Sequence, residues 1–209
     1  MLYHFVRGVL LGFLRPYTRL SVEGEERVPR AGSFVLAPVH RSFADFALVS
    51  SVTRRPLRFM AKDSLWGNRV LGWVLDRLGA FPVHRGTVDR QALRSSIELL
   101  DAGQPLVIFP EGTRRTGPVV DDLFEGAAYV AVRSGVPIVP VGIGGSERMM
   151  QKGKKLPRPT RVHIVVGEPI AVPGDGGRTS RSAVHKLTIE LQEQVQQLFD
   201  RAQQRAGAG

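Results

Sequence analysis

His40 and Asp45 stand five residues apart and have the side chains of a general base and its orienting acid. In an unbroken helix, residues at this spacing point about 140° apart, so the two side chains need an intervening turn to meet. Ser42 supplies one, because Ser-x-x-Asp is a capping-box pattern that predicts a helix beginning at Ser42, with Asp45 in its first turn. Asp45 then fixes the imidazole while His40 takes a proton. The alternative is that Asp45 only caps a helix and His40 is a surface loop residue.

Two further clusters carry arginine, whose planar guanidinium can donate two parallel hydrogen bonds to a phosphate group. One is HRG at 84–86, and the other is PEGTRR at 110–115. Arg85 and Arg114, with Arg115 next to the latter, predict a site for an anionic group. Gly112 permits a sharp turn, and Glu111 can accept hydrogen bonds from substrate hydroxyls or hold an arginine in place. Taken singly, each arginine is better explained as a solvated surface charge.

Each of the three clusters follows a short apolar run typical of a buried strand. In an open α/β sheet the ligand crevice lies outside the carboxyl ends of the strands, so we expect the clusters to meet around one crevice. Helices are predicted over 89–100, 124–133 and from near Ser182 to about Ala202. The predicted strands are 20–22, 34–39, 57–61, 80–83, 106–109, 138–143 and 162–166.

The composition limits the fold and the chemistry. A chain of 209 residues with 43% hydrophobic residues can bury a full core. The absence of cysteine excludes disulfides, a thiolate nucleophile and a thiolate metal site, and we predict no metal and no cofactor. We predict a single α/β domain with a mixed, largely buried sheet flanked by helices, plus an N-terminal interfacial helix. Residues 1–17 form that amphipathic membrane-interface helix, 18–206 the α/β domain, and 207–209 a frayed tail.

The net charge of +10 predicts an anionic partner: a nucleic acid, a membrane surface or a phosphorylated small molecule. Aromatic residues make up only 7% of the chain, which argues against nucleic acid. The basic residues between 152 and 161, namely Lys152, Lys154, Lys155, Arg158 and Arg161, favour an anionic membrane. The alternative is a solvated loop.

The N-terminal segment is apolar but too short to span a bilayer. Its charge-free run, 8–14, lies between Arg7 and Arg15, whereas a spanning helix needs roughly 18 to 20 apolar residues. Phe5, Val9 and Phe13 on one side of a helix, with the arginines at its edge, predict a position in the membrane interface. The alternative is a first helix that packs on the core.

Both tryptophans of the chain, Trp66 and Trp73, lie in an apolar stretch flanked by Arg69 and Arg77. This stretch is predicted to be a second interfacial helix or the wall of an apolar tunnel. Its alternative is ordinary core packing.

The order HRSFAD, GAFPVHRG, FPEGTR and VPIVPVG, which runs from His40 to Gly142, resembles the glycerolipid acyltransferase family of the 1-acylglycerol-3-phosphate and lysophospholipid type. The combination of four motifs is far more specific than any one of them. The resemblance implies that His40 is the catalytic base and Asp45 its orienting partner. It also implies that the acceptor phosphate and glycerol are bound by Arg85, Glu111, Gly112, Thr113 and Arg114, with Phe81 and Pro140 near the acyl site.

Two positions depart from the family pattern. Val39 replaces the usual Asn before the histidine, and Glu125 stands where Lys is common. Neither of them is the base, its partner or a principal arginine. They leave the preferred acceptor open.

By this resemblance the chain is an enzyme of phospholipid biosynthesis. It is expected to transfer an acyl group from acyl-CoA or acyl carrier protein to lysophosphatidic acid, at the cytoplasmic face of the cell membrane as a peripheral or monotopic protein. Glycerol 3-phosphate or another lysolipid is the alternative acceptor. A thioester hydrolase and a non-catalytic basic membrane-binding protein are the remaining alternatives.

Overall fold

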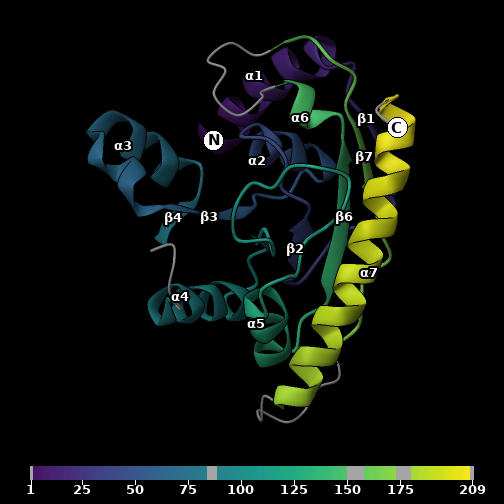
Figure 1. Ribbon diagram of the computed structural model, residues 1–209. Helices are drawn as coiled ribbons and strands as arrows, with labels where there is room; N and C mark the ends of the chain where they lie inside the picture. Colours follow the sequence, from purple (N-terminus) through teal and green to yellow (C-terminus); the bar gives the residue numbers. More distant parts are fainter. Residues whose placement is uncertain (1, 84–88, 150–157, 173–179, 208–209) are drawn as a thin grey trace.

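A seven-stranded sheet runs through the computed structural model, which describes residues 2–83, 89–149, 158–172 and 180–207 (Figure 1). Neighbouring strands are parallel except β6 and β7, in the order β1-β7-β6-β2-β5-β3-β4. The predicted mixed sheet is therefore confirmed, and each predicted strand forms with ends shifted by at most two residues. The strands are β1 (Ser21–Glu23), β2 (Val35–Pro38), β3 (Arg58–Lys62), β4 (Ala80–Val83), β5 (Leu106–Val107), β6 (Ile138–Gly144) and β7 (His163–Val166).

Helices flank the sheet and cover its faces. The α-helices are α1 (Leu2–Tyr17), α2 (Asp45–Val49), α3 (Arg69–Arg77), α4 (Arg90–Asp101), α5 (Gly126–Ser134), α6 (Ser146–Met149) and α7 (Arg181–Ala206). Short 3-10 turns are η1 (Glu25–Arg27), η2 (Ser50–Val52) and η3 (Asp63–Gly67).

Strand β2 lies at the centre of the sheet, and all four of its residues are buried. It pairs in parallel with β5, where Leu36 lies opposite Val107, and with β6 on its other side. Because β2 and β5 are parallel neighbours, the segments that follow them leave the sheet side by side. The segment that begins with His40 therefore lies next to the one that contains Glu111.

Helix α7 packs along β6 and β7 (Figure 1). Gly142 and Gly144 permit this close approach, because a Cβ at either would collide with the α7 backbone. The helix continues to Ala206, beyond the predicted end near Ala202, since Ala202 and Ala206 are both buried. Arg148 also donates to the carbonyl groups of Ala206 and Gly207 at its C-terminal end.

Helix α1 has two different faces. Leu11 and Leu14 are buried on the inner face, whereas Phe5, Val9 and Phe13 are 70%, 61% and 59% exposed on the outer one. Core packing and an exposed apolar stripe, which the sequence posed as alternatives, thus occur together on one helix. No helix among the described residues is both long and apolar enough to cross a membrane.

Arg7 lies on the inner side of α1 and donates hydrogen bonds to the main chain that follows α2. Its Nε donates to the carbonyl of Ser50 at 3.0 Å and its Nη2 to that of Thr53 at 2.7 Å. Burial lowers the pKa of Arg7 from its usual value. Arg7 therefore ties α1 to the C-terminal end of the α2–η2 segment rather than rimming the exposed apolar stripe, while Arg15 is exposed.

Candidate active site

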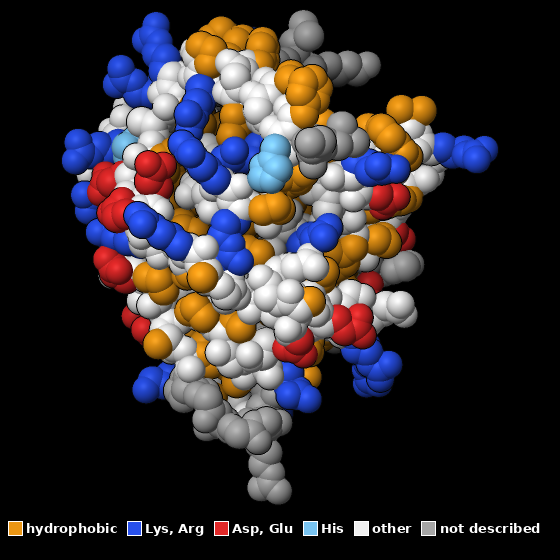
Figure 2. Space-filling view, turned by 180° about the vertical axis from the view of Figure 1, so that it is seen from behind, with side chains coloured by type: hydrophobic (Ala, Val, Ile, Leu, Met, Phe, Trp, Pro, Cys, Tyr) orange, Lys and Arg blue, Asp and Glu red, His pale blue; other side chains and the backbone are white. Residues whose placement is uncertain are grey.

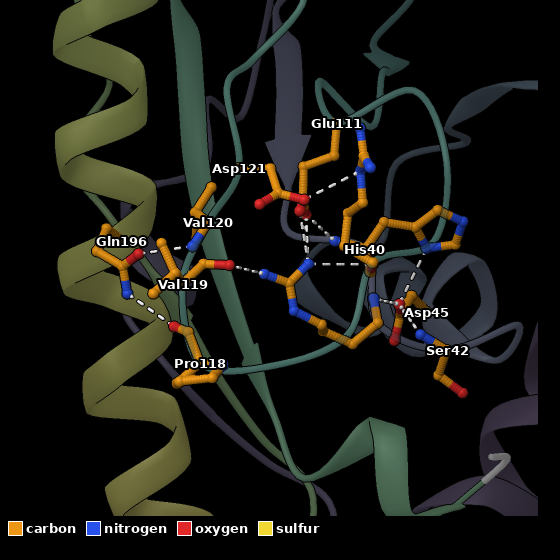
Figure 3. A network of polar contacts seen from close by, with 11 residues as sticks. His40, Ser42, Asp45, Glu111, Pro118, Val119, Val120, Asp121 and Gln196 are labelled. Carbon is orange, nitrogen blue, oxygen red and sulfur yellow. Dashed lines mark hydrogen bonds and ion pairs between the residues drawn. The ribbon is translucent and has the colours of Figure 1, made fainter. Parts of the chain in front are cut away.

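The structure brings His40 and Asp45 together at the carboxyl end of β2. Nδ1 of His40 lies 3.0 Å from Oδ2 of Asp45. The same oxygen accepts the N–H groups of Arg41 at 2.7 Å and Ser42 at 2.6 Å. Asp45 is fully buried, and His40 is 8% exposed. The predicted turn thus forms, with the aspartate at its centre (Figure 3).

The helix after this turn begins at Asp45, not at Ser42 as predicted. Only half of the capping box is present: the acid reaches back to the N–H of Ser42, whereas the Ser42 hydroxyl accepts the N–H of Ala44 at 3.3 Å. Three donors surround one oxygen of this carboxylate and hold residues 41–44 in a turn. The helix therefore begins only after the turn. Asp45 still lies in the first turn of α2, as predicted.

Among the residues that the structure describes, the contacts of His40 leave one ring nitrogen free. An ionised carboxylate only accepts hydrogen bonds, so Nδ1 of His40 carries the proton that faces Asp45. The imidazole stacks on Phe109, with ring centroids 4.1 Å apart. Nε2 makes no hydrogen bond to the described residues. This arrangement presents an unprotonated Nε2 to a substrate proton.

Glu111 lies behind His40 and has no exposed surface. Its Oε1 accepts the backbone N–H of His40 at 2.8 Å, and both of its oxygens accept Nη1 of Arg41 at 2.7 and 2.6 Å. Of the two expectations for Glu111, holding an arginine is the contact that the structure shows. That arginine is Arg41, which sequence reasoning does not single out.

The segment after Glu111 wraps around His40. Gly112 has a φ of +67°, and a Cβ there would meet the ring of Phe124. Arg115 donates its backbone N–H to the carbonyl of His40 at 3.0 Å, and its side chain pairs with Asp121. Gly112, Thr113 and Arg114 are exposed, and Arg114 makes no ion pair with the described residues. Arg114 is therefore available to a ligand beside the histidine.

Comparison with known proteins decides the family. The sequence profile of the Acyltransferase family matches residues 19–144, more than half of the chain. The chain belongs to the acyltransferase family. The matched range contains His40, Asp45, Glu111 and Arg114, and it confirms the resemblance drawn from the four motifs.

Several relatives of this acyltransferase carry the same description. The 1-acyl-sn-glycerol-3-phosphate acyltransferase of Bacillus subtilis is 27% identical over 97% of this chain and 100% of its own length. That of Chlamydomonas reinhardtii is 31% identical over 78% of this chain but only 50% of its own length. The crystal structure of the 1-acyl-sn-glycerophosphate acyltransferase PlsC from Thermotoga maritima superimposes with a TM-score of 0.70 at 26% identity, covering 91% of this chain and 80% of that one.

The motif after β4 lies only partly within the described residues. Arg85, predicted as a phosphate ligand, lies outside them, as do Lys152, Lys154 and Lys155. Phe81 is half-buried in β4 and packs against the core. Strand β4 is at the edge of the sheet, three strands from β2, so its loop starts farther from His40 than the loop after β5 does.

The three remaining candidates differ in exposure. Trp73 on α3 is 53% exposed, with the Arg77 guanidinium 5.2 Å from its ring centroid. Trp66 is half-buried and donates its indole N–H to Asp76 at 2.9 Å. Pro140 is buried in β6 and therefore offers no surface to a membrane. Helix α3 does not pack in the core in the ordinary way, because Val70 and Leu71 are exposed together with Trp73.

Proposed function

We propose that this acyltransferase moves a fatty acyl group from the thioester of acyl-CoA or acyl carrier protein to the free hydroxyl of lysophosphatidic acid, giving phosphatidic acid. The observation that carries the proposal is the His40 ring, held at Nδ1 by Asp45, with Nε2 not hydrogen-bonded to any residue that the structure describes. The descriptions of the relatives support lysophosphatidic acid as the acceptor.

The reaction needs one proton carrier. Nε2 of His40 removes the proton of the acceptor hydroxyl as the oxygen attacks the thioester carbonyl, and Asp45 stabilises the imidazolium that forms. The tetrahedral intermediate then breaks its carbon–sulfur bond. The sulfur leaves with the electron pair and takes the proton back from His40. No acyl-enzyme forms, which agrees with a chain that has no cysteine.

The acceptor phosphate is assigned to Arg114 and Arg85. Arg114 is exposed, and the backbone N–H of the next residue, Arg115, donates to the His40 carbonyl, so the main chain of Arg114 lies beside that of the base. Its planar fork fits a phosphate group. Arg85 is proposed as the second ligand from its motif alone.

The apolar outer stripe of α1 is proposed to lie in the membrane interface. A helix that is apolar on both faces normally has both of them covered, and here the core covers only one. Exposed Val70, Leu71 and Trp73 of α3 supply a second apolar surface. Figure 2 shows hydrophobic side chains gathered at the top of the molecule, over α1, with arginine and lysine side chains beside them. This fits a peripheral or monotopic protein on the cytoplasmic face of a membrane that contains anionic lipid.

The test supplies labelled acyl thioester with lysophosphatidic acid, with glycerol 3-phosphate, with an uncharged lysolipid or with no acceptor. Labelled phosphatidic acid formed fastest with lysophosphatidic acid supports the proposal. Faster acylation of another acceptor would replace lysophosphatidic acid by that acceptor. Release of free fatty acid alone would indicate a hydrolase, and no turnover would indicate a binding protein.

A further inference from the structure

Arg41, the residue after the catalytic histidine, is an almost fully buried cation. Its side chain is 1% exposed, and that of its ion-pair partner Glu111 is 0% exposed. Nη1 of Arg41 also donates to the His40 carbonyl at 3.3 Å, and Nη2 donates to the Val119 carbonyl at 3.0 Å. The guanidinium carbon lies 4.7 Å from the centroid of the Phe199 ring. All of these partners belong to the protein.

A buried ion pair is a weak source of stability, because desolvation of both charges offsets most of their attraction. The position of this pair indicates another use. Glu111 accepts Nη1 of Arg41 and the backbone N–H of His40 through the same oxygen, Oε1. The Arg41 guanidinium thus keeps the Glu111 carboxylate aimed at the main chain of the base.

Two buried carboxylates therefore hold His40 at different points. Asp45 fixes the imidazole at Nδ1, and Glu111 fixes the backbone from which that imidazole projects. Asp45 also accepts the backbone N–H of Arg41, so the arginine's own peptide belongs to the same turn. A displacement of this backbone would move Nε2 relative to the acceptor hydroxyl.

We infer that Arg41 is a positioning residue for His40, acting through Glu111, and that Glu111 serves this task instead of binding the hydroxyls of the acceptor. The inference rests on the proposed function, because it assigns His40 the role of base. It differs from what the family resemblance implies for Glu111. Full burial of both carboxylate oxygens leaves them no surface for a substrate in this structure.

The support extends from the site to α7. The segment that carries Val119 is held to this helix by one side chain: Oε1 of Gln196 accepts the N–H of Val120 at 2.7 Å, and Nε2 of Gln196 donates to the carbonyl of Pro118 at 3.1 Å. Figure 3 shows the resulting line of contacts from α7 through Val119 to His40. The far end of Arg41 is thus anchored on a helix that lies outside the matched range, 19–144.

The first experiment separates positioning from binding. In Arg41→Gln and Glu111→Gln, kcat is expected to fall about 10- to 100-fold because the base is displaced, while KM for the acceptor stays within about twofold. Arg41→Lys keeps the positive charge but lacks the planar guanidinium, and it is expected to have a higher kcat than Arg41→Gln. The matched control is Arg55→Gln, since Arg55 also donates to two carbonyls and lies over a buried ring, that of Phe34, but contacts neither carboxylate.

The double variant Arg41→Gln/Glu111→Gln tests whether the two residues act as a unit. If they do, its kcat matches that of the worse single variant, because the second change removes nothing more. Thermal melting of each protein shows whether it is folded, and where Arg41→Gln does not fold, Arg41→Lys and Glu111→Gln carry the comparison.

A second readout does not depend on turnover. In a nitrogen-labelled protein, the Nδ1–H signal of His40 reports its hydrogen bond to Asp45, and it is expected to shift or broaden in Glu111→Gln and to be unchanged in Arg55→Gln. If the wild type transfers no acyl group but this signal responds, the proposed function fails and the positioning inference stands. A raised acceptor KM with kcat retained, a double variant whose defect is the product of both single defects, or an unchanged Nδ1–H signal would each overturn the inference.

Discussion

Asp45 holds His40 through a single oxygen: Oδ2 lies 3.0 Å from Nδ1 of the ring and also accepts two backbone N–H groups of the same turn. The acid thus determines the shape of the turn as well as the tautomer of the base. Its other oxygen, Oδ1, is buried and has no partner among the described residues. One carboxylate therefore links the folding of the turn to its chemistry.

Replacing Asp45 by Asn is expected to lower kcat by at least about 100-fold, because a neutral amide no longer stabilises the imidazolium that forms when His40 takes the proton. The measurement is steady-state acyl transfer beside a thermal melt. Since Asn keeps the size of the side chain, the variant should fold. Wild-type kcat in a folded Asp45→Asn protein would contradict the role given to this acid.

The outer stripe of α1 is expected to drive membrane binding. Changing Phe5, Val9 and Phe13 together to Ser should weaken co-sedimentation with anionic phospholipid vesicles at least about tenfold, because each apolar side chain buried in lipid contributes on the order of 1 kcal/mol or more. The control is Ile189→Ser, which alters an exposed apolar side chain on α7. Equal binding of the triple variant and the wild type would remove α1 from the membrane interface.

The packing of α7 on β6 depends on Gly142. Gly142→Ala is expected to lower the free energy of unfolding by about 1–3 kcal/mol or more, because the new Cβ meets the backbone at Leu198 and Phe199. Gly8→Ala is the control, since a Cβ at Gly8 meets nothing and alanine favours a helix. Urea unfolding measures both. A Gly142→Ala protein as stable as the wild type would show that the helix is free to move outward.

His163 on β7 is expected to make stability depend on pH. Burial lowers its pKa from 6.5, and the opposing attraction of Glu23 is the smaller effect. Its Nδ1 lies 2.6 Å from Oγ of Ser21 and its Nε2 lies 3.6 Å from Glu23, while Arg201 also pairs with Glu23. Because the folded protein binds this proton less tightly, the unfolded chain gains it first as the pH falls below 6.5, and stability declines there.

The check is the melting temperature of the wild type and of His163→Gln at about pH 7.5 and about pH 5.5. The decrease between the two conditions should be smaller in the variant, which lacks the titrating group. An identical decrease in both proteins would assign the pH dependence to other residues.

The central fold was predictable because its signals are local. Short apolar runs identify the strands, and the polar residues after 39 and 109 mark the carboxyl ends of two neighbours, β2 and β5. The meeting of His40 with Asp45 was predictable because a five-residue spacing and a turn bring them together. The start of α2 was not, since Asp45 accepts the N–H groups of Arg41 and Ser42, while the Ser42 hydroxyl accepts the N–H of Ala44 instead of that of Asp45.

Long-range contacts lay beyond local reasoning. Arg41 and Glu111 are 70 residues apart. From the sequence alone, an arginine in a loop is interpreted as a solvated charge, because its buried partner is not known. The inward position of Arg7 has the same cause, because its acceptors are carbonyls more than 40 residues away. The available signal was Glu111 close behind a predicted strand, because a carboxylate that is buried there requires a cation nearby.

The most direct test is the rate of labelled phosphatidic acid formation by His40→Ala and by the wild type, with folding of both confirmed by thermal melting. With the base removed, the rate is expected to fall at least about 100-fold, since general-base catalysis contributes this much or more. A folded His40→Ala protein that keeps more than about a tenth of the wild-type rate would contradict His40 as the base.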